Sequence, residues 1–348
     1  MHNKVLIQYS LGEFEIPAEY PANPSEYSYS NVVNRRVAGQ HQISWVPEPF
    51  GSQVLESYEK LKANLISGLL FHDVLPLLED ETSPASMVDA SAPASWWGAA
   101  QKIRSVCNAL GIHLCSYQSE NDGTLFVHLV PQEGESASAN KSRGRLRGHT
   151  DAVAMPFPHE TGQFSVGCPS PDLVILACIR NPNSVATRVA PLSTIVGSLE
   201  RGIIEKLRES CFDIYPQQSF STPHGYKLGA VPLLHLDPFD GYKIRFSHSK
   251  IVPSDPSDAL AIRALEMLQG AVETSYEDLI LRSGDLLLLN NRTAIHGRTV
   301  VSKIVDQVKF DRWLMRTYGM HRNPSDFRRA ESLEFVLGDD ASLSLGRS

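Results

Sequence analysis

Two histidines and an aspartate stand at positions from which they could bind one metal ion. His149 and Asp151 are two residues apart, and His296 follows much later in the chain. On a β-strand, residues i and i+2 project from the same face, so both side chains of the pair could reach one ion. Two imidazoles and one carboxylate leave coordination positions open on an ion such as iron(II), where a co-substrate and oxygen could bind.

The segments that surround these residues make the pattern specific, because a His-x-Asp pair by itself occurs by chance in many proteins. Residues 149–151 are followed by the strand-like segment GDLLLLNN at 284–291, and then by His296-Gly297-Arg298. The chain holds a second such pair, His235 and Asp237, which lacks these downstream segments. We interpret that second pair as structural.

Two arginines follow His296 on a further candidate strand, residues 308–318. In an extended strand Arg312 and Arg316 share one face and lie about 13 Å apart, at about 3.3 Å per residue. Buried arginines are costly unless each meets an anion, and a guanidinium matches a carboxylate as a two-pronged fork. One arginine therefore suits the distal carboxylate of 2-oxoglutarate and the other a carboxylate of a substrate. The alternative is an exposed strand with two solvated arginines.

Helical periodicity and short apolar runs alternate irregularly along the chain. Apolar residues at helical spacing predict helices over 53–70, 95–110, 192–207 and about 254–272. Short apolar runs with turn residues at their ends predict strands over 124–130, 172–179, 242–246, 285–289 and 308–318. Many short strands with a few interposed helices favour a β-barrel or jelly roll with helical decoration. A doubly wound sheet would need regular alternation and a Gly-rich phosphate loop, and the sequence has neither.

The composition excludes several classes of protein. Of the 348 residues, 42% are hydrophobic and 20% are charged, and the formal net charge is −7. No long basic run is present, which argues against nucleic acid or an anionic membrane as the partner. No apolar stretch is long enough to span a bilayer, and the first residues lack a signal peptide. The five cysteines form no CxxC pair, so we expect reduced thiols and a cytoplasmic location.

The chain has no internal repeat and no low-complexity linker that would divide it. We therefore expect a single domain over residues 1–348. Two polar, Ser- and Gly-containing segments, 131–148 and 215–229, have the length and composition of lid loops. The tail, 338–348, is expected to be disordered.

Taken together, these motifs resemble the clavaminate synthase-like (TauD-type) branch of the iron(II)/2-oxoglutarate-dependent oxygenases. This branch includes hydroxylases of free amino acids such as asparagine, arginine and lysine. The resemblance spans about 125–318 and is carried by residues 149–151, 176–181, 284–286, 296–298 and 311–316. The fold that it implies is mainly β with helices (α+β), with a double-stranded β-helix (jelly roll) core and helical insertions.

The resemblance also implies roles for individual residues. The metal ligands would be His149, Asp151 and His296. Arg312 would bind the distal carboxylate of 2-oxoglutarate, and Arg316 the α-carboxylate of an amino-acid substrate. Gln118 and Ser138 would lie near the amine and carboxylate of that substrate. The implied reaction uses Fe(II), 2-oxoglutarate and O2 to hydroxylate an unactivated C–H bond; desaturation and cyclisation in natural-product biosynthesis are alternatives.

The sequence departs from this branch in two places. Many members carry glutamate where Asp151 stands. Arginine hydroxylases place acidic residues in the region that corresponds to 244–249, and no acid stands there in this chain. The second departure favours a neutral or less basic substrate side chain.

Two other functions are compatible with parts of the pattern. A zinc hydrolase could use the same ligands, but it would need a general base, and no HExxH-like feature exists. A non-catalytic jelly-roll module could bind a small carboxylate. The sequence leaves the oligomeric state open.

Overall fold

The computed structural model of the chain describes most residues between 51 and 323 and two short outlying strands. The described ranges are 6–10, 51–78, 83–84, 87, 96–132, 142–160, 168–222, 225–238, 241–301, 311–323 and 336–337. Ser138, which the resemblance placed near the substrate, and the tail 338–348 lie outside these ranges.

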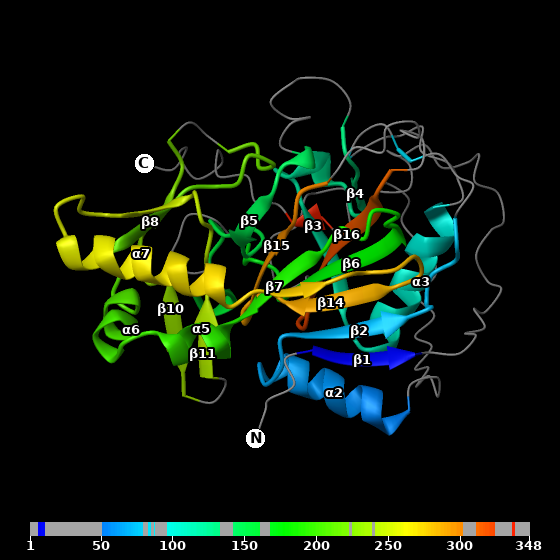
Figure 1. The fold of residues 1–348 in the computed structure, drawn as a ribbon, viewed down its shortest axis with the longest axis horizontal. Coiled ribbons are helices and arrows are strands. Elements are labelled where there is room, and N and C mark those ends of the chain that lie inside the picture. Colours follow the sequence, from blue (N-terminus) through cyan, green and yellow to red (C-terminus); the bar gives the residue numbers. More distant parts are fainter. Residues whose placement is uncertain are drawn as a thin grey trace.

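The larger of two facing sheets has eight strands (Figure 1). Their order is β1 (Leu6–Ser10), β2 (Gly68–His72), β14 (Leu286–Asn290), β6 (Leu173–Arg180), β16 (Trp313–Met320), β3 (His113–Tyr117) and β17 (Val336–Leu337), with β4 (Val127–Leu129) paired to β16. Every residue of β6 and of β14 is buried. The sequences of these two strands are almost entirely apolar because both faces of the sheet are covered.

The smaller sheet carries the histidines of the candidate metal site. Its order is β13 (Glu277–Leu279), β7 (Thr187–Pro191), β15 (Ala294–Arg298) and β5 (Leu146–His149). Strands β15 and β5 are antiparallel, and His296 stands directly opposite His149. Two further small sheets extend this side of the molecule: β12 (Ile251–Pro253), β8 (Phe212–Ile214) and β9 (Leu228–Val231) form one, and β10 (Leu234–Asp237) and β11 (Gly241–Ile244) the other.

Helices cover the outer faces of both sheets (Figure 1). Helices α2 (Ser52–Lys62) and α3 (Trp96–Ala109) pack on the larger sheet. Helices α5 (Leu192–Ser198), α6 (Arg201–Leu207) and α7 (Ala259–Thr274) pack on the smaller one. A third apolar cluster fills the space between the sheets and contains residues of both, such as Leu176 and Val189. None of the helices that the structure describes combines the length and apolar character needed to cross a lipid bilayer.

The helix predicted over 53–70 ends much earlier. Helix α2 stops at Lys62, Asn64 takes a left-handed conformation (φ 58°), and Gly68–His72 forms β2. Leu69 and Leu288 are paired across β2 and β14. The apolar residues after Lys62 keep helical spacing, but pairing with a strand distant in the sequence decides their structure.

Two other predicted helices also differ at their ends. The helix over 192–207 is divided into α5 and α6, because Leu199 and Glu200 are extended (ψ 143° and 147°). The helix predicted from 254 begins only at Ala259, where the Asp258 side chain accepts a hydrogen bond from the Ala261 N–H at 2.9 Å. That side chain caps the helix.

The described residues cover only parts of the two segments predicted as lids, 131–148 and 215–229. Residues 133–141 and 223–224 lie outside it, while residues 146–148 belong to β5 and residues 228–229 to β9. The lid roles and the single-domain organisation stay predictions.

Gly297 allows β15 to approach β5 closely beside the two histidines. A Cβ atom at this position would lie 2.6 Å from the carbonyl oxygen of Leu146, which belongs to the backbone of β5. Gly297→Ala should therefore push the strands apart and lower the free energy of unfolding by about 1–3 kcal/mol, measured by urea denaturation. Gly270→Ala, on α7 where a Cβ would meet nothing within 4 Å, is the control and should stabilise by about 0.5–1 kcal/mol. Equal stabilities of Gly297→Ala and the wild type would contradict this packing.

Candidate metal centre

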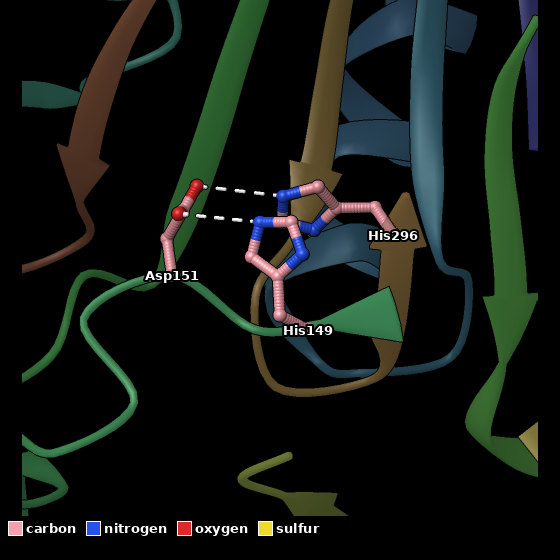
Figure 2. Close-up of side chains that lie close together, drawn as sticks. All are labelled: His149, Asp151 and His296. Atoms are coloured by element: carbon pink, nitrogen blue, oxygen red, sulfur yellow. Dashed lines mark ion pairs between the residues drawn. The ribbon is translucent and has the colours of Figure 1, made fainter. Parts of the chain in front are cut away.

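The side chains of His149, Asp151 and His296 meet between the two sheets (Figure 2). Their ligand atoms all lie within 4.8 Å of one another. The Nε2 atom of His296 is 3.4 Å from Oδ2 of Asp151, and the Nε2 atom of His149 is 3.7 Å from Oδ1. Each imidazole thus presents a nitrogen to a different oxygen of one carboxylate, as expected for three ligands around one ion.

The spacing from His149 predicted that Asp151 lies on the same strand, but the strand ends before it. Strand β5 ends at His149, and Asp151 stands in the turn that follows, next to Ala152 with a φ of 50°. The buried amide of Asn291 holds this turn: its Oδ1 accepts from the Asp151 N–H at 2.9 Å, and its Nδ2 donates to the Asp151 carbonyl at 3.0 Å. The carboxylate is therefore positioned by a side chain from the turn between β14 and β15.

Removing this support should weaken the site without removing a ligand. Asn291→Leu should lower the affinity for a divalent metal by about 10–100-fold, the usual effect of losing a partner that orients a ligand. Competition with a chromophoric chelator measures this affinity. Asn108→Leu, at an exposed position on α3, should leave the affinity unchanged. If the Asn291 variant bound metal as tightly as the wild type, the turn around Asp151 would not depend on the Asn291 side chain.

The polar atoms of the cluster fit a cation. The carbonyl of Arg147 accepts from the Nδ1 N–H of His149 at 3.0 Å, so Nε2 carries the lone pair that faces Asp151. Burial, and then the neighbouring His296, lowers the pKa of His149 to about 4. At neutral pH the Nε2 atom of His149 therefore carries no proton that could bridge it to the Asp151 carboxylate. Within the described residues, Oδ2 of Asp151 and Nδ1 of His296 are buried without a hydrogen-bond partner. A metal ion bound between Nε2 of His149 and the Asp151 carboxylate would remove the repulsion between the lone pairs of these two ligands.

Arg316 keeps the carboxylate of Asp151 ionised. Burial alone would raise the pKa of Asp151, but the Arg316 guanidinium and then His296 hold it below its ordinary value. The Nη1 atom of Arg316 is 3.4 Å from Oδ1 of Asp151, and Nη2 donates to Oε1 of Glu120 at 2.7 Å. The cluster therefore offers an anionic ligand at neutral pH.

Two further arginines, Arg298 and Arg312, form a second cationic region between the sheets. Arg312 precedes β16, is 4% exposed and has no acidic partner among the residues that the structure describes. Arg298 donates from Nη2 to the Gly144 carbonyl at 2.6 Å. Burial lowers the pKa of each guanidinium to about 10, and for Arg312 the charge of Arg298 adds to this. Such a pair favours an anionic ligand, and a carboxylate fits its fork-shaped donors.

The remaining residues singled out from the sequence are placed differently. Arg316 faces the interior, as strand alternation on β16 predicted, with 12% of its side chain exposed, but protein carboxylates already contact it. Gln118 is exposed, and its assignment to the substrate stays a prediction, as does that of Ser138. Glu120, two residues further, is the buried residue that reaches Arg316.

Sequence reasoning gave no role to Glu120, Asn291 or Gln217. Gln217, in the second predicted lid, donates from Nε2 to the Thr150 carbonyl at 3.1 Å and accepts from the Val153 N–H at 3.4 Å. It therefore ties that loop to the turn that holds Asp151. Of the three, only Asn291 belongs to a motif that stood out, the end of GDLLLLNN.

The fold resembles solved structures of non-haem iron oxygenases. An asparagine oxygenase in complex with Fe(II), 2S,3S-3-hydroxyasparagine and succinate matches with a TM-score of 0.67 and 19% identity, covering 96% of this chain and 99% of that one. The non-haem iron oxygenase OrfP, in complex with Fe and alpha-ketoglutaric acid, matches with a TM-score of 0.69 and 20% identity, covering 95% and 99%. These likenesses confirm the predicted α+β jelly roll with helical insertions.

Two curated proteins are similar in sequence, although no family model matches the chain. The L-lysine 3-hydroxylase of Catenulispora acidiphila is 26% identical over 268 residues, which are 73% of this chain and 66% of that protein. The L-asparagine oxygenase of Streptomyces coelicolor is 26% identical over 229 residues, 64% and 62% of the two chains. The matched region thus spans just under two thirds of each relative. Both are named for the oxidation of an amino acid, which confirms the resemblance predicted from the motifs.

Proposed function

We propose that the protein is an iron(II)/2-oxoglutarate-dependent dioxygenase that hydroxylates an unactivated C–H bond of a free amino acid or an amino-acid-like small molecule. The observation that carries this proposal is the cluster of two histidines and one carboxylate, together with the buried Arg312, which has no acidic partner among the described residues. A zinc hydrolase has no use for a buried anion site of this kind. A simple carboxylate-binding module has no use for the ligand cluster.

In this proposal His149, Asp151 and His296 hold the iron. When bound, the iron uses O2 and 2-oxoglutarate to oxidise the substrate, with one oxygen atom passing to the substrate and the other to succinate as carbon dioxide leaves. Asn291 fixes the carboxylate ligand, and Arg316 keeps it ionised. Arg312, with Arg298 beside it, receives the distal carboxylate of 2-oxoglutarate.

The space around the site is mostly apolar. The cluster between the sheets includes Leu176, Val189, Leu287 and Leu314, each at most 5% exposed. These side chains exclude water from the reacting groups, which strengthens the electrostatic contacts inside and limits side reactions.

The pair of Arg316 and Glu120 suits the backbone of a free amino acid. The guanidinium can receive the α-carboxylate, and its Nε has no partner among the described residues. The carboxylate of Glu120 can receive the α-ammonium group. The relatives support a substrate of this class, since one is named for lysine, one for asparagine, and an OrfP structure holds (3S)-hydroxy-L-Arg.

We also propose that the protein acts in the cytoplasm, on a small molecule rather than on nucleic acid or a membrane. No two of the five cysteines form a disulfide, which fits a reducing compartment. Desaturation or cyclisation would use the same site, and the products distinguish them from hydroxylation.

A panel of free amino acids tests the proposal. Incubation with Fe(II), 2-oxoglutarate and O2 should give succinate in step with a product 16 Da heavier than one of the amino acids, measured by mass spectrometry. A product 2 Da lighter would instead indicate desaturation or cyclisation. Succinate formation that no amino acid stimulates would contradict the substrate class.

A further inference from the structure

We propose that Arg245 and Ser247 select the substrate by its side chain, and that this side chain ends in a carbonyl oxygen, as a carboxylate or carboxamide does. Side chains that end in an ammonium or guanidinium group are rejected. The inference rests on the proposed function, because it concerns the amino acid bound at that same site.

Backbone pairing places Ser247 on the face of the metal ligands. Ser247 forms an antiparallel bridge with His149, and the neighbouring Thr150 N–H donates to the Phe246 carbonyl at 2.8 Å. Residues directly opposite in such a pair project from the same face. Ser247 therefore shares the face of His149.

The position of Phe246, which lies between Arg245 and Ser247 in the chain, supports this orientation of the two side chains. Phe246 packs in the outer core beneath α5, α6 and α7, together with Ile295 of β15. Ile295 alternates with His296, so the outer core lies on the face opposite the ligands. Arg245 and Ser247, which alternate with Phe246, therefore point into the space between the sheets.

Arg245 is a buried cation with hydrogen-bond donors to spare. It is 2% exposed, and its Nη2 donates to both oxygens of Glu160, at 2.7 and 2.5 Å. Its Nε and Nη1 have no partner within the described part of the chain. Glu160 also accepts from the Phe157 N–H at 2.8 Å, so its carboxylate is already used. The groups left for a ligand are donors, and a carbonyl oxygen would satisfy them.

The surroundings of Arg245 disfavour a second cation. The guanidinium carbons of Arg245 and Arg292 stand 4.0 and 4.7 Å from the centroid of the same Phe157 ring. The ring centroids of His159 and His235 are 4.5 Å apart, with the rings tilted by 36°, and the His235 ring centroid is 6.4 Å from that of Phe157. Burial lowers the pKa of both histidines, and the charges of Lys243 and Arg245 add to this. Glu160 already pairs with Arg245, and Asp172 with Arg292 at 3.3 Å. A substrate ammonium or guanidinium group would have to compete with these arginines for the two carboxylates.

Binding without turnover tests the selection directly. Calorimetry on the protein with Fe(II) and 2-oxoglutarate, without oxygen, compares glutamine, glutamate, asparagine and aspartate with lysine, arginine and norleucine. We expect one of the first four to bind at least tenfold more tightly than lysine, arginine or norleucine. Tighter binding of lysine or arginine would overturn the inference.

A double substitution tests whether Arg245 causes the preference. Arg245→Met with Glu160→Met removes both charges, so no unpaired charge is left buried. The preference over norleucine should fall by at least tenfold, while the affinity for 2-oxoglutarate stays unchanged. The exposed pair Arg201 and Glu205, replaced in the same way, is the matched control and should change neither value.

A milder variant keeps the test decisive if the double variant does not fold. Ser247→Ala removes one hydroxyl and should weaken binding of the preferred amino acid, but not of norleucine, by about threefold or more. An unchanged preference in a folded Arg245/Glu160 variant, or in Ser247→Ala where only that variant folds, would overturn the inference.

The outcomes separate this inference from the proposed function. Failure to bind 2-oxoglutarate or to form succinate would contradict the proposed function itself. Succinate formed with lysine or arginine as the best substrate would contradict only the selection by Arg245 and Ser247. Tight binding of 2-oxoglutarate with no amino acid bound would count against both.

Discussion

Asp151→Ala and His296→Ala should each abolish the formation of succinate from 2-oxoglutarate. Each variant removes one of three side chains whose ligand atoms lie within 4.8 Å of one another. The loss should exceed the roughly 10–100-fold effect that follows when only a partner of a ligand is removed. Succinate measured by chromatography, at saturating iron and substrate, gives the size of the loss.

Folding must be controlled separately, because the cluster is buried. Asp151→Ala leaves Arg316 paired with Glu120, so the cation is not left alone. Circular dichroism should show that the variants stay folded. His113→Ala, at the start of β3 and away from the cluster, should keep full activity. Turnover by chelated wild-type protein would also contradict the metal assignment.

Arg312→Ala should raise the KM for 2-oxoglutarate by about 30-fold or more. Truncating one partner of a buried charge pair typically costs about 2–5 kcal/mol of binding, and each 1.4 kcal/mol is a factor of ten. The free energy of unfolding should not fall, because Arg312 has no acidic partner among the described residues. Initial rates of succinate formation over a range of 2-oxoglutarate concentrations measure the effect.

The conservative variant and a second arginine as control sharpen this experiment. Arg312→Lys keeps the charge but loses the two-pronged contact, so its KM should lie between those of the wild type and Arg312→Ala. Arg188→Ala, on β7 with its own partner Asp278, should leave the KM unchanged. The role of Arg312 is wrong if its alanine variant binds 2-oxoglutarate as the wild type does.

The sequence predicted the parts of the site that depend on local periodicity. The His-x-Asp spacing, the apolar run of β14 and the return to His296 together indicated a strand pair that brings three ligands to one place. Alternation along β16 likewise predicted that Arg316 faces inward. Both inferences need only the geometry of a strand and the register of its neighbour.

Other features depend on contacts between residues far apart in the chain. Glu120 and Arg316 are 196 positions apart, and Asn291 reaches Asp151 across 140. No local pattern marks these partners. The absence of acid near 244–249 was visible in the sequence, but the buried pair of Arg245 with Glu160 was not, since Glu160 lies 85 positions away. The end of α2 was missed for the same reason, because β2 pairs with the distant β14.

One spectrum tests most directly whether this is an iron(II)/2-oxoglutarate oxygenase. Fe(II) and 2-oxoglutarate are added to the protein without oxygen, and the visible absorption is recorded. We predict a weak metal-to-ligand charge-transfer band in the wild type, its loss in His296→Ala, and its appearance only at higher 2-oxoglutarate in Arg312→Ala. No band in the wild type at saturating iron and 2-oxoglutarate would contradict the proposed function.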